Sequence, residues 1–210
     1  MKDKYKRFIL VPGAFNPPTI AHVKMSKLLC ELFPKSSVVY LPARDEYITG
    51  WKEQDCPIPY LDRISLLENA INNYEIGVST VEQDTIITGK TYDVVSWFKS
   101  RFKGYEIVIC LGEDKLKELP RWYSYDKLVS ENKFIIMTRN KSRETFPLEL
   151  LSYADNFEFL DFDYPDISST KIREAYLSGQ LDTVREFIPH NVYEYLQTYN
   201  DLFKEVDTNV

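Results

Sequence analysis

The sequence lacks several features that would place a protein in a broad functional class. It has no basic surplus, because 26 lysines and arginines stand against 32 aspartates and glutamates, which gives a formal net charge of −6. Binding to a long nucleic acid relies on Lys and Arg to neutralise phosphates, so this balance argues against that function. No run approaches the roughly 20 consecutive apolar residues of a membrane span, and the charged start at 1–7 does not resemble a signal peptide. We therefore expect a soluble, cytoplasmic protein that binds neither nucleic acid nor membrane.

Cysteine is scarce as well. Cys30, Cys56 and Cys110 are widely spaced and form neither a CxxC pair nor a cluster with histidine, which argues against disulfide and zinc frameworks. Hydrophobic residues at 44% and aromatic residues at 14% are, by contrast, abundant enough to build a buried core. We expect residues 1–210 to form one domain, with 203–210 as a candidate disordered tail.

Apolar segments with strand and helix spacing alternate along the chain, which predicts an α/β fold with an open, mostly parallel sheet. Short apolar runs predict strands at 8–11, 38–41, 76–81, 106–111, 134–137 and 157–162. Helical spacing predicts helices at 21–32, 60–71, 91–98, from 166–170 to 178, and along 192–203. Thr91 is the predicted N-cap of the third helix. The polar segment 42–59 is too long for an ordinary connection, so we expect an irregular loop that contacts substrate.

The segment 12–22 joins the first predicted strand to the first predicted helix. Gly13 allows the backbone to approach a ligand, while Pro17 and Pro18 stiffen the loop. Backbone N–H groups and a helix N-terminus then face whatever lies above the strand, an arrangement that suits phosphate. His22, in the first turn of the helix, is expected to point to the same place. A turn of this composition also occurs for purely structural reasons.

A second candidate segment, 167–173, opens a helix near the C-terminus. Three hydroxyl residues are followed by Lys171 and by Arg173, which lies about one turn beyond Ser169. Hydroxyl groups at a helix start commonly serve only as caps. Here donors of three kinds converge, which favours binding of a phosphate chain.

The third candidate segment follows the predicted strand at 106–111. The carboxylate of Asp114 is placed to accept hydrogen bonds from ribose hydroxyls, and Trp122 offers a flat face for stacking a heteroaromatic ring. Trp122 is equally suited to cover the core. Because ligands bind beyond the carboxyl ends of the strands of an open α/β sheet, we expect all three segments to meet at one edge.

Together these segments resemble a known superfamily. Residues 13–22, GAFNPPTIAH, resemble the (T/H)xxH signature of the nucleotidyltransferases, and 167–173, ISSTKIR, resemble their second phosphate signature. With 112–114, 122–123 and 188–189 included, nearly the whole chain resembles the nicotinamide or nicotinate mononucleotide adenylyltransferases. The resemblance implies a Rossmann-like fold with helices on both faces of the sheet and C-terminal helices. It also implies transfer of AMP from ATP to a pyridine mononucleotide, with Mg2+ arriving on the ATP and no dedicated metal site.

The resemblance further assigns roles to individual residues. It implies that His22 donates to the α-phosphate, that Thr19 replaces a first histidine, and that Arg173 grips phosphate with its guanidinium fork. The implied ATP-binding residues are Gly13, Ala14, Phe15, Gly112, Asp114, Ser168, Ser169, Thr170 and Arg173. The implied mononucleotide-binding residues are Asn16, Lys52, Thr91, Asp93, Trp122 and Tyr123, with weaker candidates in Arg44, Arg63 and Arg139. His190, the other histidine, is expected to be structural.

Two alternatives share the phosphate signatures: a sister transferase, such as a pantetheine-phosphate adenylyltransferase or a cytidylyltransferase, and a nucleotide-binding regulator without turnover. The choice of mononucleotide is also open. In the relatives that prefer the acid, a Ser-Tyr-Thr segment opens the helix whose N-terminus lies near the nicotinate carboxylate. The residues of this chain that resemble that segment are Thr91-Tyr92-Asp93. A carboxylate there would repel nicotinate and favour nicotinamide mononucleotide or dual use. Asp93 is, however, equally suited to complement the helix dipole.

Overall fold

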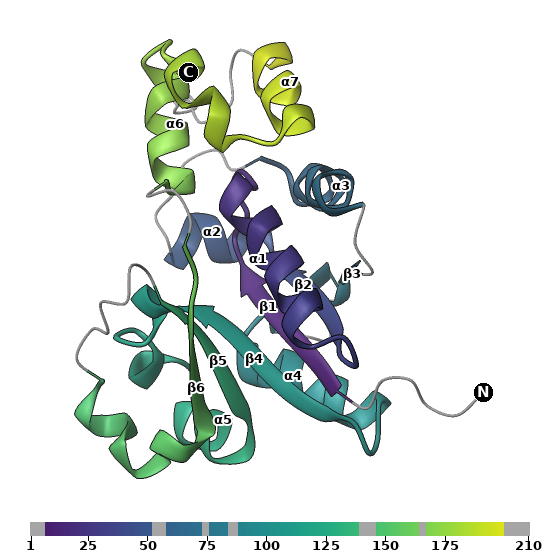
Figure 1. The fold of residues 1–210 in the computed structure, drawn as a ribbon, viewed down its shortest axis with the longest axis vertical. Helices are drawn as coiled ribbons and strands as arrows, with labels where there is room; N and C mark the ends of the chain where they lie inside the picture. The colour runs from purple at the N-terminus through teal and green to yellow at the C-terminus, as the bar shows by residue number, and fades with distance from the viewer. Residues whose placement is uncertain are drawn as a thin grey trace, which may run out of the picture.

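The computed structural model describes residues 7–51, 58–72, 76–83, 88–138, 146–163 and 167–199. At its centre is a six-stranded sheet in the order β3-β2-β1-β4-β5-β6, with parallel pairing throughout (Figure 1). The strands are β1 (Arg7–Gly13), β2 (Ser37–Pro42), β3 (Ile76–Val78), β4 (Glu106–Gly112), β5 (Lys133–Thr138) and β6 (Phe157–Asp161). Strand order reverses between β1 and β4, which opens a crevice at their carboxyl ends. The predicted α/β, Rossmann-like fold is confirmed.

Seven α-helices occur in the described residues: α1 (Ile20–Leu32), α2 (Asp45–Trp51), α3 (Tyr60–Ile71), α4 (Thr91–Arg101), α5 (Tyr125–Glu131), α6 (Ser169–Leu177) and α7 (His190–Thr198). Short 3-10 turns lie at Val81–Gln83, Glu113–Lys115, Leu119–Arg121, Leu148–Asn156 and Leu181–Phe187. None of the helices in these described ranges is long and apolar enough to cross a membrane.

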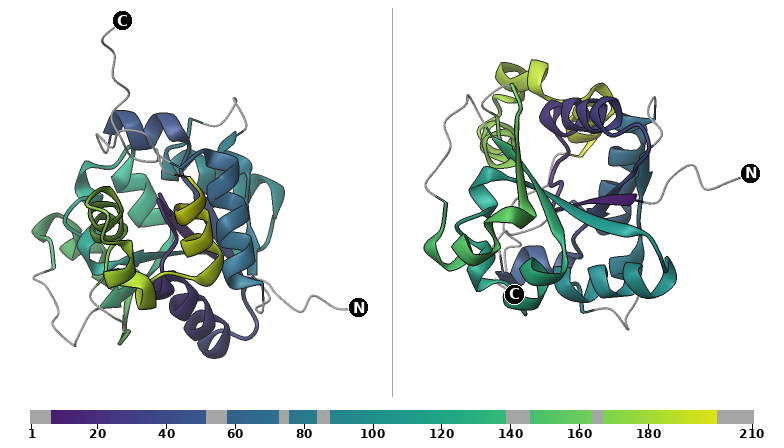
Figure 2. Two further views of the ribbon diagram at one scale, coloured as in Figure 1. Left: turned by 90° about the horizontal axis from the view of Figure 1, so that it is seen from above. Right: turned by 60° about the horizontal axis from the view of Figure 1, so that its bottom comes forward.

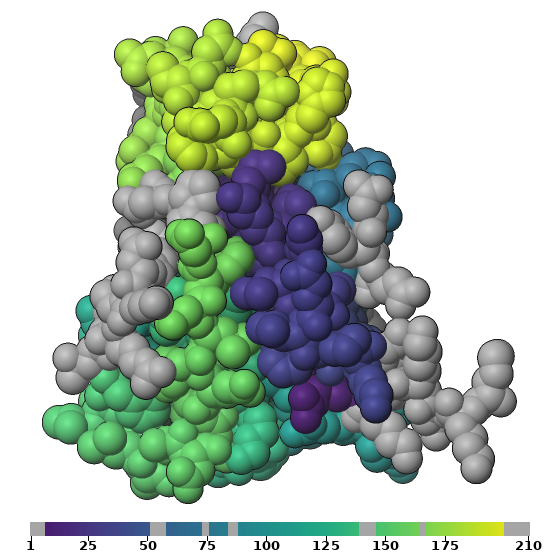
Figure 3. Space-filling model, viewed as in Figure 1, coloured from purple at the N-terminus to yellow at the C-terminus, as the bar shows by residue number. Residues whose placement is uncertain are grey.

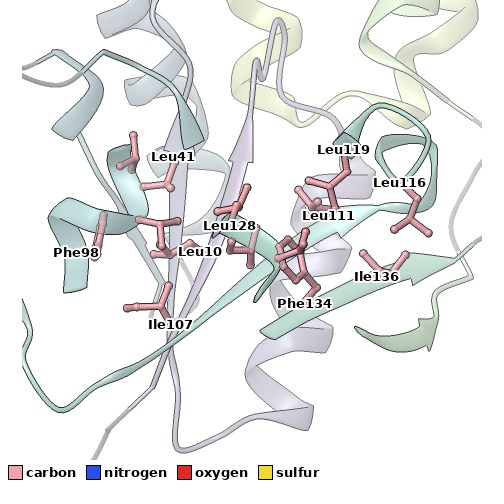
Figure 4. Packing of buried hydrophobic residues seen from close by; sticks show 14 of the residues in the cluster. Leu10, Leu41, Phe98, Ile107, Leu111, Leu116, Leu119, Leu128, Phe134 and Ile136 are labelled. Carbon is pink, nitrogen blue, oxygen red and sulfur yellow. The ribbon is translucent and has the colours of Figure 1, made fainter. Parts of the chain in front are cut away.

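The sheet separates two apolar layers, because successive strand residues point to opposite faces. On one face Leu10 and Ile109 pack with Phe98 of α4 and with residues of α5, as Figure 4 shows for ten labelled side chains. On the other face Ile9 packs with Leu29 of α1 and with residues of α3. This arrangement, with helices on both faces, follows from strands that are apolar on both sides.

The C-terminal helices α6 and α7 form a third cluster beyond the sheet. Ile172 of α6 and Val192 and Leu196 of α7 pack with Ile58 and with Leu66 of α3. In Figures 1 and 3 these helices lie at the top of the view, above the upper end of α1, and Figure 2 shows them from above. The start of α6 is thereby brought to the same end of the sheet as the start of α1.

Several predicted boundaries needed correction. Residues 42–59 were expected to be irregular, but α2 occupies 45–51, held by the fully buried Ile48. Thr91 is the first helical residue of α4 rather than its N-cap, which is Lys90. The strand expected at 76–81 ends at Val78. The last helix ends at Thr198, and the expected continuation over 200–203 lies outside the described residues.

Candidate active site

The loop between β1 and α1 has a conformation that only its particular residues permit. Phe15 has a φ of 49°, is 3% exposed, and folds its ring back beneath the loop. A Cβ atom at Gly13 would come within 2.8 Å of the Phe15 ring, so a larger residue there would displace it. The ring also meets the His22 ring edge to face, with 5.0 Å between centroids. Glycine is therefore needed at position 13 for packing.

His22 is held in one orientation by the residue that precedes its helix. The backbone N–H of Thr19 donates to Nδ1 of His22 at 2.9 Å, and the Thr19 hydroxyl lies 3.1 Å from the same atom. Since Nδ1 accepts, the ring proton is assigned to Nε2. Burial lowers the pKa of His22 to about 4, which keeps the ring neutral at physiological pH. His22 can therefore donate a hydrogen bond through its Nε2–H group. Thr19 is only 2% exposed, and its hydroxyl contacts His22.

The start of α6 is hydrogen-bonded to the β1–α1 loop. Arg173 Nη1 donates to the carbonyl of Asn16 at 2.8 Å, and its Nη2 donates to Oγ1 of Thr170 at 3.1 Å. The Ser169 hydroxyl donates to the carbonyl of Pro17, also at 2.8 Å. Burial lowers the pKa of Arg173, although the guanidinium remains charged. The structure thus brings together the two segments that the sequence pointed to.

Two other predicted residues of these segments use their side chains within the protein. The Ser168 hydroxyl caps α6 by accepting from the Lys171 N–H at 3.2 Å. The Asn16 side chain is fully buried, and its Oδ1 accepts from the Ile58 N–H at 2.9 Å. Asn16 therefore ties the loop to the segment before α3.

A pocket of about 540 Å³ lies at the carboxyl ends of β1, β2 and β4. This volume is in the range of small-molecule sites. Five predicted residues line it, namely Gly13, Ala14, Thr91, Trp122 and Tyr123. Arg44, a weaker candidate, and Glu46 and Tyr47 of α2 line it as well. Although 42–59 is partly helical, its described part does reach the expected site.

Trp122 lies between the core and the pocket. It is half-buried and packs against the apolar layer of α4 and α5, while it also lines the pocket. Tyr123, which is 52% exposed, places its ring 4.2 Å from the ammonium of Lys90 and 6.4 Å from the ring of Tyr92. An aromatic and cationic wall therefore stands beside Trp122 at the start of α4.

Glu82 was not predicted, yet it lines the pocket and is only 4% exposed. Its Oε2 accepts from the Arg44 N–H at 3.3 Å, and the Arg44 guanidinium donates to the Glu82 carbonyl. Burial raises the pKa of Glu82 to about 8, against the opposing effect of Arg44. The sequence did hold a signal for this residue, because Glu82 follows the third strand at the edge where ligands bind.

Arg63, another weaker candidate, lies beneath the loop with its side chain fully buried. Its three donor groups bind Ile58 O at 2.8 Å, Ala14 O at 2.6 Å and Asp45 Oδ1 at 2.6 Å. Burial lowers the pKa of Arg63, and Asp45 opposes that effect. The structure therefore gives this arginine partners within the protein and keeps it off the pocket surface.

Gly112 ends β4 and Asp114 lies just beyond it, and neither lines the pocket, whereas their neighbours Leu111 and Lys115 do. A Cβ atom at Gly112 would lie 2.6 Å from Oδ1 of Asp114, which shows how closely the carboxylate folds back over the glycine. Asp114 also lies 3.5 Å from the Lys115 ammonium.

The remaining candidates lie elsewhere. Asp93 accepts from the Thr88 hydroxyl and is absent from the described pocket lining. His190 opens α7, where it contacts Arg185 at 2.9 Å and Glu194 at 3.2 Å. Lys52 and Arg139 lie outside the described residues.

Comparison with known proteins places the chain in a family. The model of the cytidylyltransferase-like family matches residues 10–175, a span that contains both predicted phosphate segments and the residues that line the pocket. The chain therefore belongs to the cytidylyltransferase-like family. A relative from Acholeplasma laidlawii is 31% identical, with 92% of this chain and 96% of that protein covered. One from Endomicrobium trichonymphae is 28% identical over 91% and 96% of the two chains. Both are named as probable nicotinate-nucleotide adenylyltransferases, and the chain belongs with that group.

Solved structures agree with the fold. A nicotinic acid mononucleotide adenylyltransferase of Plasmodium falciparum, in complex with NaAD, aligns with a TM-score of 0.73 at 21% identity, covering 93% of this chain and 97% of that one. The same enzyme in complex with APC aligns with a TM-score of 0.70. At this identity the likeness supports the architecture described above.

Proposed function

We propose that this protein transfers AMP from ATP to nicotinate mononucleotide, forming nicotinate adenine dinucleotide and pyrophosphate in the synthesis of NAD. The observation that carries the proposal is the contact of Arg173 with the carbonyl of Asn16, which joins the two predicted phosphate segments, while the first residues of the same loop, Gly13 and Ala14, line a pocket of about 540 Å³. The substrate comes from the names of relatives that match over nearly their whole length.

The reaction needs no nucleophilic side chain. A phosphate oxygen of the mononucleotide bonds to the α-phosphorus of ATP, the bond from that phosphorus to the bridging β-phosphate oxygen breaks, and pyrophosphate leaves with the electron pair. The attacking group is already an anion, so catalysis consists of alignment and charge stabilisation. The neutral His22 ring, with its proton on Nε2, would donate to the α-phosphate as charge develops.

The other residues are proposed to divide between the two substrates. Backbone groups at 13–15 and the start of α6, with Arg173, would hold the triphosphate. Gly112 and Asp114 would hold the adenosine ribose. Trp122 would stack on the pyridine ring, with Thr91 and Tyr123 beside the ring substituent.

Mg2+ is proposed to accompany ATP. No group of three or more His, Cys, Asp and Glu side chains in the described part of the chain could hold a metal ion. Mg2+ is commonly bound through substrate phosphates and water with few protein ligands. When bound, the ion would neutralise charge on the phosphates.

The test is pyrophosphate release with purified protein. We expect turnover with ATP and nicotinate mononucleotide, and nicotinate adenine dinucleotide as the product by mass spectrometry. Phosphopantetheine with ATP, and a cytidylyl acceptor with CTP, test the sister transferases. Turnover with one of those and none with either pyridine mononucleotide would overturn the proposal, and binding of ATP without any turnover would favour the regulator.

A further inference from the structure

We infer that Lys90 sets the preference of this pocket for an acid over an amide on the pyridine ring. The inference rests on the proposed function and deepens it. Lys90 lines the pocket, is the N-cap residue of α4, and is exposed to solvent. Its ammonium lies 4.2 Å from the centroid of the Tyr123 ring.

Lys90 and Tyr123 lie side by side in the pocket lining. If the pyridine ring stacks on Trp122, the next residue, Tyr123, borders the ring substituent. Lys90 and Thr91, at the start of α4, line the pocket together with Tyr123, and the ring of Tyr92 lies 6.4 Å from that of Tyr123. A carboxylate at this place would meet the Lys90 ammonium, and the positive end of the helix dipole would add to the attraction.

The ammonium of Lys90 is available for such a ligand. Within the described ranges no carboxylate lies at ion-pair distance from Lys90, and its contact is with the electron-rich face of Tyr123. Two of the three carboxylates that line the pocket have partners of their own: Glu82 accepts from the Arg44 N–H at 3.3 Å, and Glu118 accepts from Lys115 at 2.9 Å.

Asp93 is the residue most able to oppose Lys90, because it lies in the first turn of α4. Its carboxylate accepts from the Thr88 hydroxyl, and it is not among the described residues of the pocket lining. Lys90 and Thr91, in contrast, both line the pocket. Of the two charged residues at the start of α4, Lys90 therefore faces the pocket and Asp93 does not. The expectation of amide preference, which depended on Asp93, loses its geometric basis.

The experiment compares kcat/KM for nicotinate and nicotinamide mononucleotide in the wild type and three lysine variants. Lys90→Met removes the charge and keeps much of the side-chain length. Lys90→Arg keeps the charge. Lys99→Met is the matched control, because it removes a lysine of the same helix whose ammonium binds Glu131 at 3.4 Å.

We expect Lys90→Met to lower the acid-over-amide ratio about tenfold, equivalent to about 1.4 kcal/mol, chiefly through a higher KM for the acid. Lys90→Arg and Lys99→Met should retain the wild-type ratio. Equal loss for both mononucleotides, or an unchanged ratio in Lys90→Met, would overturn the inference. So would a ratio that changes in Asp93→Asn and not in Lys90→Met. Absence of turnover with both mononucleotides in the wild type would instead refute the proposed function itself.

Discussion

The guanidinium of Arg173 donates a 2.8 Å hydrogen bond to the carbonyl of Asn16, a residue 157 positions earlier in the chain. The neighbouring Ser169 binds the carbonyl of Pro17 in the same way. The loop after β1 and the start of α6 are therefore joined in the protein itself, without a phosphate between them. Donors that are fixed before substrate binds need little reorganisation when charge develops on a phosphate.

Replacing Arg173 tests whether this contact also serves catalysis. We expect Arg173→Ala to lower kcat/KM for ATP by about 100-fold or more, because a charge-stabilising donor is lost. Arg173→Lys should recover part of the activity, since lysine keeps the charge but not the fork that reaches Asn16 and Thr170 together. Steady-state kinetics with varied ATP measure both effects. Arg185→Ala, which changes an arginine near α7, is the control, and equal losses in the two alanine variants would contradict a phosphate role.

His22 provides a second prediction. The neutral ring donates through Nε2, so we expect His22→Ala to lower kcat by about 100-fold or more with little change in KM. Because the pKa of His22 is lowered to about 4, its protonation should not affect kcat between pH 6 and about 8. A pH–rate profile of the wild type checks this. A step near pH 6.5 that disappears in His22→Asn would contradict the neutral ring.

The same pKa shift links His22 to stability. Between about pH 6.5 and 4 the unfolded chain binds a proton at His22 and the folded protein does not. The contribution of His22 to folding therefore becomes less favourable as the pH falls through this window. We expect Tm to fall more steeply from pH 7 to pH 5 in the wild type than in His22→Asn. Parallel Tm curves for the two proteins would refute the buried neutral histidine.

Sequence patterns predicted the helices and strands that the local spacing of apolar residues determines. The apolar spacing of 60–71 predicted α3 with its bounds, and the run at 8–11 predicted the centre of β1. Helix α2 was missed, because seven residues that include Gly50 show little periodicity and depend on tertiary contacts such as Asp45 with Arg63. The short helix α5 was missed as well.

For the candidate site, too, the sequence predicted what depends on local pattern and did not predict what depends on tertiary contacts. The segments 12–22 and 167–173 were predicted to meet, because each follows or opens a regular element at the same edge of the sheet. The sequence did not predict which acceptor each side-chain donor binds. From the sequence alone, Arg63 was as well suited to bind a phosphate as to bind the Ala14 carbonyl. Its partner depends on packing between segments that lie far apart in the sequence.

Trp122 carries the next prediction. If the pyridine ring stacks on the indole, Trp122→Ala should raise KM for nicotinate mononucleotide at least about fivefold, since an aromatic stacking contact is worth about 1–3 kcal/mol. Trp122→Phe should lose less. KM for ATP is the internal control and should change little. A rise in KM for ATP as large as that for the mononucleotide would show that Trp122 acts only through the packing beneath it.

The buried guanidinium of Arg63 supports the loop that carries Gly13 and Phe15. Its removal leaves the carbonyls of Ala14 and Ile58 without their donor and leaves Asp45 without its cation. We expect Arg63→Met to lower the free energy of unfolding by about 2–6 kcal/mol, because each of the two buried carbonyls left without a donor costs about 1–3 kcal/mol. Urea denaturation measures the loss.

A variant of Asp45 separates the two contributions of Arg63, namely its ion pair with Asp45 and its hydrogen bonds to the carbonyls of Ala14 and Ile58. The Asp45 side chain is 41% exposed and also accepts from the Tyr60 N–H at 3.2 Å, so Asp45→Asn should cost far less, within about 1 kcal/mol. The double variant Arg63→Met/Asp45→Asn should be close in stability to Arg63→Met alone, because most of the loss arises at the two carbonyls. If Asp45→Asn restored most of the stability of Arg63→Met, the unpaired carboxylate would be the cause, and the support of the Ala14 carbonyl would contribute little.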